Sequence, residues 1–230
     1  MMTALEDSEK RRPRRGPVSS RLLAIYSLLN ARYGPQYWWP GETPFEVMVG
    51  AILTQSASWK GVEKAIANLK AAGALNAKAL RELPLEELGR LIRPSVYYNA
   101  KAKKLRHLGE HLARYGDDLD RFFDKDIAGL RRELLSIHGI GQETADSIIL
   151  YAAGKPTFVI DAYTRRLFRR LGLAPERDTY ANWQALFMEN LPHDVRLFNE
   201  YHALIVRHGK EAAQNGHTCE VCSPGPLRFP

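Results

Sequence analysis

Almost the whole chain has the apolar spacing of helices that are separated by helix-stopping residues. In "SSRLLAIYSLLNARYG" the serines are expected to cap a helix and the glycine to end it. "TPFEVMVGAILTQ" opens with Thr43, has Pro44 at the first helical position and places Glu46 three residues after the threonine, as in a capping box. The one β-like run, "KPTFVID", is short and isolated, so we interpret it as an extended connector. These patterns predict an all-α fold.

Further helices are expected from Ser58 onward, in "PLEELGRLIRP", and in "SVYYNAKAKKLRHLGEHLARYG" up to Gly116. Five more are expected at about 126–137, 142–153, 161–171, 178–190 and 194–209.

We expect two helical subdomains with a cleft between them that holds the functional site. Residues 35–155 would form the central one. Residues 19–34 with 156–230 would form the second, and residues 1–18 a disordered basic tail.

Charge and cysteine content limit the partners and the compartment. The 230 residues carry a formal net charge of +7, which favours a polyanion such as nucleic acid as partner. The only two cysteines exclude a disulfide framework and suit a reducing cytoplasm. No apolar run approaches the roughly 18 residues of a membrane span, and the N-terminus lacks the apolar core of a secretory signal. We therefore expect a cytoplasmic, nucleoid-associated monomer.

The stretch "LLSIHGIGQETADSII" predicts a helix, a tight hairpin and a second helix. Gly139 and Gly141 can adopt backbone angles that side chains exclude, and Ile137 and Ile140 would anchor the turn in the core. The N–H groups at the start of the second helix could hold a phosphate. An ordinary helix–helix turn is the alternative. Residues 129–170 hold seven Lys/Arg against four Asp/Glu, which favours DNA.

Asp161 follows the extended connector and opens a helix. Asp is a preferred N-cap residue, and its charge suits the helix dipole. An ionised carboxylate beside a DNA clamp could also stabilise a cationic sugar, or orient and activate water. The two roles are compatible.

A Gly-x-Gly hairpin, a connector and an Asp that opens a helix together resemble the DNA glycosylases of the endonuclease III superfamily. The resemblance extends over roughly residues 20–222 and includes "PFEVMVGAILTQSASWKGVEKAIANL", "IRPSVYYNAKAKKLRHL" and "RHGK". It implies double-stranded DNA with a damaged base as partner, Asp161 as the catalytic residue, and Gln55 as the side chain that enters the gap left by the flipped base. A solvent-exposed helix end is the alternative for Gln55. The hairpin could also bind a monovalent cation. The remaining DNA-binding residues implied are Gly139, Ile140, Gly141, Gln142, Thr144 and Arg165.

A basic run of Lys101, Lys103, Lys104 and Arg106 either contacts phosphates or forms a solvated helix face.

Two departures from the family pattern concern catalysis and cofactor. Glu143 aligns with the lysine that attacks the sugar in bifunctional members, and a carboxylate cannot form a Schiff base. We therefore expect water as the nucleophile and no strand nicking. The family usually has four cysteines that bind a 4Fe–4S cluster, whereas Cys219 and Cys222 remain here. The cluster is expected to be lost and no cofactor is expected. A zinc site that adds His208 and His217 is less favoured than a remnant pair.

These departures resemble the bacterial 3-methyladenine DNA glycosylases, which show Trp-Trp-Pro, the hairpin Glu and Arg-Pro-Ser at these positions. The resemblance implies an aromatic base pocket with a lysine beside it, where Trp59 replaces the expected phenylalanine. Core packing is the alternative role for the tryptophans. The pocket residues are Trp38, Trp39, Pro40, Trp59 and Lys210.

An aromatic pocket suits a cationic base, because indole faces attract cations. Alkylation at N3 or N7 charges the purine and weakens its glycosidic bond, so that one carboxylate could suffice. The sequence therefore predicts a monofunctional DNA glycosylase of base excision repair that acts on alkylated purines such as 3-methyladenine. Two alternatives stay open: a uracil, thymine-mismatch or oxidised-pyrimidine glycosylase on the same scaffold, and a catalytically silent protein that binds damaged DNA.

Overall fold

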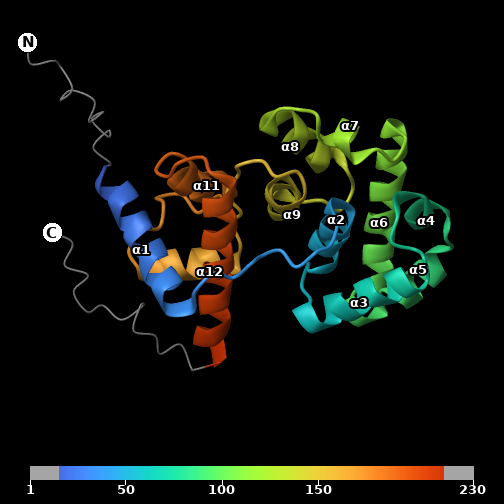
Figure 1. The fold of residues 1–230 in the computed structure, drawn as a ribbon, viewed down its shortest axis with the longest axis horizontal. Helices are drawn as coiled ribbons and strands as arrows, with labels where there is room; N and C mark the ends of the chain where they lie inside the picture. Colours follow the sequence, from blue (N-terminus) through green and yellow to red (C-terminus); the bar gives the residue numbers. More distant parts are fainter. Residues whose placement is uncertain (1–15, 215–230) are drawn as a thin grey trace, which may run out of the picture.

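The structure is a computed structural model that describes residues 16–214, and every regular element within this range is helical (Figure 1). The predicted all-α fold is confirmed. The elements are α1 (Pro17–Tyr33), α2 (Pro44–Leu53), α3 (Trp59–Ala71), α4 (Ala77–Glu82), α5 (Leu85–Leu91), η1 (Arg93–Ser95), α6 (Tyr98–Leu112), η2 (Ala113–Tyr115), α7 (Leu119–Phe123), α8 (Ile127–Ser136), α9 (Gln142–Ser147), η3 (Ile148–Ala152), α10 (Ala162–Arg170), α11 (Tyr180–Met188) and α12 (Val195–Gln214).

The buried side chains form two hydrophobic clusters. One joins α2, α3, α6 and the α8–α9 region, and the other joins α1 with the connector and α10 to α12. Figure 1 shows α1, α11 and α12 on the left, α2 to α6 on the right, and α8 and α9 between them. Ile149 packs in the first cluster and Leu150 in the second, so η3 links them. The subdomain boundaries stay a prediction, which the two clusters support.

Side-chain caps begin most of the longer helices, as the sequence predicts. Thr43 Oγ1 accepts from the Glu46 amide at 3.1 Å, and Ser58 caps α3. The Glu46 carboxylate accepts from the amide of Glu42 and not of Thr43, so the capping box is displaced by one residue. The predicted serine caps of α1 are wrong. Its N-cap is Gly16, because Pro17 starts the helix before the serines are reached.

Some helix bounds differ from the prediction. The expected helix 142–153 is α-helical only to Ser147 and continues as the π-helical segment η3. The short helices α4 and α7, which are capped by Asn76 and Asp118, are missed by the sequence analysis because six- and five-residue elements show little periodicity. Since α1 begins at Pro17, the predicted tail ends earlier than residue 18, and residues 1–15 lie outside the described range.

The segment before α10 is extended and has no strand partner, as predicted for a connector. Its buried residues Phe158, Val159 and Ile160 fix the position of the next residue, Asp161. Within the described range, no helix is both long enough and apolar enough to span a bilayer.

Candidate active site and DNA-binding surface

The hairpin between α8 and α9 is closed by a hydrogen bond from the Ile140 amide to the Ile137 carbonyl at 3.1 Å. Both isoleucines are buried, which confirms them as anchors. Gly139 has a φ of +90°, a conformation that favours glycine. The N-cap of α9 is Gly141, which has no side chain to accept from the first N–H groups of the helix. These groups remain available to an anion.

The conformational argument for Gly141 is wrong. Its φ of −92° and ψ of −179° are extended angles that any residue adopts. A Cβ built on Gly141 would have no atom within 4 Å, in contrast to one on Gly139. The missing side chain therefore leaves open space at the start of α9 and relieves no strain.

Gln55 is tied to the hairpin through its side-chain amide. Nε2 donates to the Gly139 carbonyl at 3.1 Å and to Thr144 Oγ1 at 2.9 Å, while Lys104 Nζ donates to Oε1 at 2.5 Å. Thr144 is buried, whereas Gln142 is exposed. The structure thus brings Gln55, Thr144 and the hairpin together. Their contacts with DNA stay a prediction, and Gln55 would have to exchange these bonds to enter a duplex.

Neither interpretation of the basic run fits Lys101. This residue is 1% exposed, and its ammonium donates to the carbonyls of Leu53 at 2.8 Å and Ser95 at 2.6 Å. Burial and the charge of Lys104 lower the pKa of Lys101 to about 8. Its role is structural, because it fastens the end of α2 to η1. The sequence pattern missed this, since three lysines within four residues resemble a solvated face.

Two exposed apolar residues follow Ser95 and were not predicted as site residues. Val96 is 50% exposed and Tyr97 is 67% exposed, and both have positive φ angles. Through Lys101, this turn is joined to the end of α2, two residues before Gln55. Bulky side chains held in a strained, exposed turn are a common feature of functional sites. The signal in the sequence was the Val-Tyr-Tyr run directly before a helix.

Asp161 caps α10, as predicted. Its Oδ1 accepts from the Thr164 amide at 2.7 Å, while Oδ2 lies 3.7 Å from Nε2 of His202. The side chain is 12% exposed. His202 Nδ1 lies 2.5 Å from the hydroxyl of Tyr151, which η3 supplies. Burial lowers the pKa of His202, against the opposing effect of the Asp161 charge, so the ring is neutral near pH 7.

The start of α9 lies within electrostatic range of Asp161. The Glu143 side chain keeps solvent access, yet its pKa is raised to about 7. Burial by the surrounding protein atoms is the largest cause, the Asp161 charge adds to the rise, and the Arg165 charge opposes it. Arg165 itself pairs with Asp178 at 2.9 Å. The second helix of the hairpin motif therefore begins near the predicted catalytic carboxylate.

The three predicted pocket tryptophans form one cluster. The ring centroids of Trp38, Trp39 and Trp59 are 5.2–5.4 Å apart in each pair, and Lys210 Nζ lies 5.8 Å from the Trp38 ring. Trp38 and Trp39 lie in the segment between α1 and α2, where each is half-buried. Trp39 also packs on Tyr151 at 5.3 Å. The aromatic cluster thus reaches Asp161 through Tyr151 and His202.

A cavity of about 200 Å³ lies beside this cluster, against α2 and α3. Trp39, Pro40 and Trp59 line it, and Trp38, Lys210 and Asp161 do not. The predicted pocket residues are therefore neighbours, but they do not line one common cavity. Trp39, Pro40 and Trp59 line the cavity, whereas Lys210 lies against the Trp38 ring. Core packing alone does not describe Trp39 and Trp59, because both border an open cavity.

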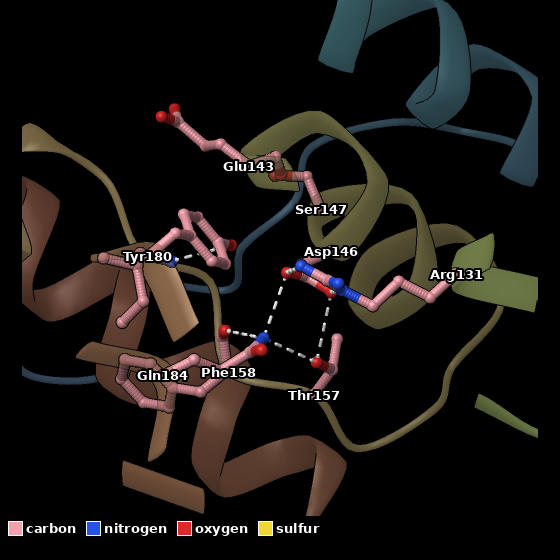
Figure 2. Close-up of polar contacts among 9 residues, drawn as sticks. Arg131, Glu143, Asp146, Ser147, Thr157, Phe158, Tyr180 and Gln184 are labelled. Carbon is pink, nitrogen blue, oxygen red and sulfur yellow. Dashed lines mark hydrogen bonds and ion pairs between the residues drawn. The ribbon is translucent and has the colours of Figure 1, made fainter. Parts of the chain in front are cut away.

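A buried polar network connects the hairpin helix with the segment that leads to Asp161 (Figure 2). Asp146 of α9 is fully buried and pairs with Arg131 of α8 at 2.9 Å. Gln184 of α11 donates to Asp146 Oδ2 at 3.0 Å and to the Phe158 carbonyl at 2.9 Å. The hydroxyl of Tyr180 accepts from the Ile160 amide at 3.3 Å, next to Asp161. The network holds α9 and the connector in a fixed relation.

The predicted remnant pair, Cys219 and Cys222, lies outside the described residues, and so does His217. The chain has two cysteines and therefore cannot supply the four thiolates that hold a 4Fe–4S cluster. Its cysteine content does not fit this cofactor. Within residues 16–214, no three His, Cys, Asp or Glu side chains gather in a way that could hold a metal ion.

Comparisons with known proteins identify the family of this chain. Residues 49–193 match the HhH-GPD superfamily of base excision DNA repair proteins. A protein of Methanocaldococcus jannaschii, described as a candidate DNA repair glycosylase, is 47% identical over 200 residues that cover 86% of this chain and 91% of the relative. Endonuclease III of Haemophilus influenzae is 26% identical over 183 residues, which cover 80% of this chain and 79% of the enzyme.

Among solved structures, the 3-methyladenine DNA glycosylase of H. pylori bound to 1,N6-ethenoadenine superposes with a TM-score of 0.73. It is 29% identical, and the match covers 84% of this chain and 97% of that protein. The chain therefore belongs to the HhH-GPD superfamily of base excision DNA repair glycosylases and has the endonuclease III-like fold.

Proposed function

We propose that this glycosylase is monofunctional and releases alkylated purines such as 3-methyladenine from double-stranded DNA. The observation that carries the proposal is the continuous series of contacts from Trp38, Trp39 and Trp59 through Tyr151 and His202 to the carboxylate of Asp161. This series supports a site in which aromatic surfaces lie close to the Asp161 carboxylate. The likeness to the H. pylori 3-methyladenine enzyme supports the same substrate class.

Indole faces suit a base that carries positive charge. A glycosylase must extrude its target nucleotide before it can act. A cationic purine against an indole face gains about 0.5–2 kcal/mol, more when water is excluded. A neutral uracil gains none of this attraction and depends on specific hydrogen bonds. The aromatic cluster therefore favours alkylated purines over uracil.

Asp161 supplies the charge that the reaction needs. The glycosidic bond breaks with its electron pair going to the base, which leaves as a neutral molecule because it was cationic. The sugar becomes an oxocarbenium ion, and the negative charge of Asp161 Oδ2 stabilises it. Water then bonds to C1′ and loses a proton, which leaves an abasic site. Oδ1 stays with the Thr164 amide, so the helix cap holds the carboxylate in place.

The absence of lyase activity is proposed from the side chains at the site. Glu143 stands where a lysine would attack the sugar, and a carboxylate forms no Schiff base. Lys101 has a lowered pKa, as a nucleophilic lysine would, but it is buried against the carbonyls of Leu53 and Ser95. It therefore cannot reach a sugar.

Duplex DNA would lie along the edge formed by the hairpin, Gln55 and the Val96–Tyr97 turn. The N–H groups at the start of α9 would bind a phosphate of the damaged strand. Val96 and Tyr97 are exposed and apolar, so they are suited to contact bases at the distorted step.

Release of free base tests the substrate class. Purified protein is incubated with duplexes that contain 3-methyladenine, 7-methylguanine, uracil or a thymine mismatch, and the released bases are separated by chromatography. We expect methylated purines and no uracil or thymine. Release of uracil or thymine alone would favour the pyrimidine enzyme, and tight binding without any release would favour a silent DNA-binding protein.

Borohydride trapping tests the absence of a lyase. The wild-type protein is expected to give no covalent adduct with a substrate duplex, while endonuclease III with its own substrate serves as the positive control. The matched variant Glu143→Lys restores an amine at this position and is expected to give an adduct. An adduct with the wild-type protein would contradict the monofunctional proposal.

A further inference from the structure

His202 has a buried ring nitrogen without a hydrogen bond. Among the described residues, no partner lies within hydrogen-bond distance of Nε2. His202 is 6% exposed, so burial away from water makes an unpaired nitrogen costly. Asp161 Oδ2 lies 3.7 Å from Nε2, which is too long for a hydrogen bond, although a shift of well under 1 Å would complete one.

The position of the ring proton follows from the two neighbours of His202. A neutral imidazole has one N–H donor and one acceptor. With the proton on Nδ1, the bare lone pair of Nε2 would face a carboxylate oxygen, which is electrostatically unfavourable. With the proton on Nε2, that N–H faces Asp161, and Nδ1 accepts from the Tyr151 hydroxyl at 2.5 Å. The second arrangement satisfies both contacts.

We propose that His202 is a positioning residue that directs its Nε2–H at Asp161 Oδ2, with its tautomer fixed by the hydroxyl of Tyr151. The inference rests on the proposed role of Asp161 in base release. In the free protein the N–H and the carboxylate are poised just beyond hydrogen-bond distance. When substrate excludes water, the two close to a hydrogen bond that holds Oδ2 toward the sugar.

Tyr151 extends this role to the aromatic cluster. Its ring packs on Trp39 at 5.3 Å, and its hydroxyl reaches His202, so one residue contacts both. The π-helical segment η3 places Tyr151 in this position, and π-helical turns often occur at functional sites. A base seated on the indole cluster would therefore meet a carboxylate whose orientation is set through the same tyrosine.

Two substitutions at one position separate the two hydrogen bonds of the ring. In His202→Gln the amide nitrogen reaches the place of Nε2 and keeps a donor for Asp161. In His202→Asn the shorter amide can replace only Nδ1, and the donor is lost. Under single-turnover conditions with a methylated duplex, His202→Asn is expected to slow base release about ten- to a hundredfold, and His202→Gln by less than about tenfold.

Affinity for a duplex with an uncleavable abasic-site analogue is measured alongside and is expected to equal that of wild type in both variants. A general loss of structure would weaken this binding and slow both variants alike. Equal rates of His202→Asn and wild-type protein would overturn the inference.

A spectroscopic measurement tests the tautomer without relying on activity. Long-range ¹H–¹⁵N correlation spectra of the histidine-labelled protein distinguish the two tautomers, and His202→Gln identifies the signal among the seven histidines. We expect His202 as the Nε2–H tautomer in wild type and a mixture in Tyr151→Phe. An Nδ1–H tautomer in wild type would overturn the inference. If wild type releases no base from any duplex, the proposed function fails, and the tautomer still decides the geometry proposed here.

Discussion

Gly139 of the hairpin lies directly against the aliphatic side chain of Lys104 in α6. A Cβ added to Gly139 would lie 2.2 Å from Cγ of Lys104. The ammonium of the same lysine donates to Gln55 Oε1, and Gln55 Nε2 in turn donates to the Gly139 carbonyl. The hairpin, α6 and the end of α2 are therefore joined by direct contacts on the edge where DNA is proposed to bind.

Gly139→Ala is expected to lower the free energy of unfolding by about 1–3 kcal/mol, because alanine is strained at a positive φ and would press on Lys104. Thermal denaturation measures this effect. Gly141→Ala is the matched control, since its backbone angles suit alanine and its Cβ would meet open space. Gly141→Ala should have the melting temperature of wild type. It should bind duplex DNA more weakly if a phosphate approaches the start of α9, because the added methyl group would occupy that space. Equal melting of the two variants would contradict the account.

Asp146→Asn is expected to cost about 2–4 kcal/mol, because it leaves the Arg131 guanidinium without its buried partner and weakens the contacts of Gln184. Chemical denaturation gives the change. Glu82→Gln serves as control, since its pair with Lys78 is exposed and 4.0 Å long and should contribute nothing measurable. Base release should also slow in Asp146→Asn, because the network fixes the connector before Asp161. Wild-type stability in this variant would rule out the proposed role of the network.

The pH dependence of stability should reveal Glu143. Its pKa is raised from about 4.5 in the unfolded chain to about 7 in the folded protein, so the folded state holds the proton longer. Stability is therefore full below the unfolded pKa and declines as the pH rises from about 4.5 to 7. Glu143→Gln lacks this titration. Its melting temperature relative to wild type should be higher at pH 8 than at pH 5, and a constant difference would refute the assignment.

Trp59 is expected to contribute to binding of a charged base. Trp59→Ala should weaken the affinity of a catalytically inactive Asp161→Asn background for a methylated duplex by about 0.5–2 kcal/mol, the range of a cation–π contact. Trp59→Phe keeps an aromatic face and should lose less. Affinity for an abasic-analogue duplex should stay the same, because that duplex presents no base. Equal losses on both duplexes would indicate a structural role for Trp59 instead.

Much of the fold follows from local chemistry. Thr43, Ser58 and Asp161 mark helix starts through short side chains that accept from the next turn, and the structure has all three caps. Ile137 and Ile140 are recognisable as anchors because a tight apolar turn must be buried. The N-cap prediction for Ser19 and Ser20 was wrong because Pro17, which is favoured at the first helical position, begins the helix before them.

The contacts that complete the site depend on tertiary structure. Tyr151 and His202 are 51 residues apart and meet only because η3 packs against α12. On its own helix, His202 resembles an ordinary core residue, and Lys101 resembles a surface lysine. The contacts of His202 and Lys101 cannot be predicted from the spacing of residues in the sequence. Each depends on which main-chain or side-chain atoms the tertiary packing brings within hydrogen-bond distance.

The rate of base release by Asp161→Asn tests the central claim most directly. Asparagine keeps an oxygen that can accept from the Thr164 amide, so the cap and the fold are retained while the charge is removed. We predict that single-turnover release of 3-methyladenine falls by at least about a hundredfold, with affinity for a methylated duplex unchanged or tighter. Release at the wild-type rate by a correctly folded Asp161→Asn would contradict the account.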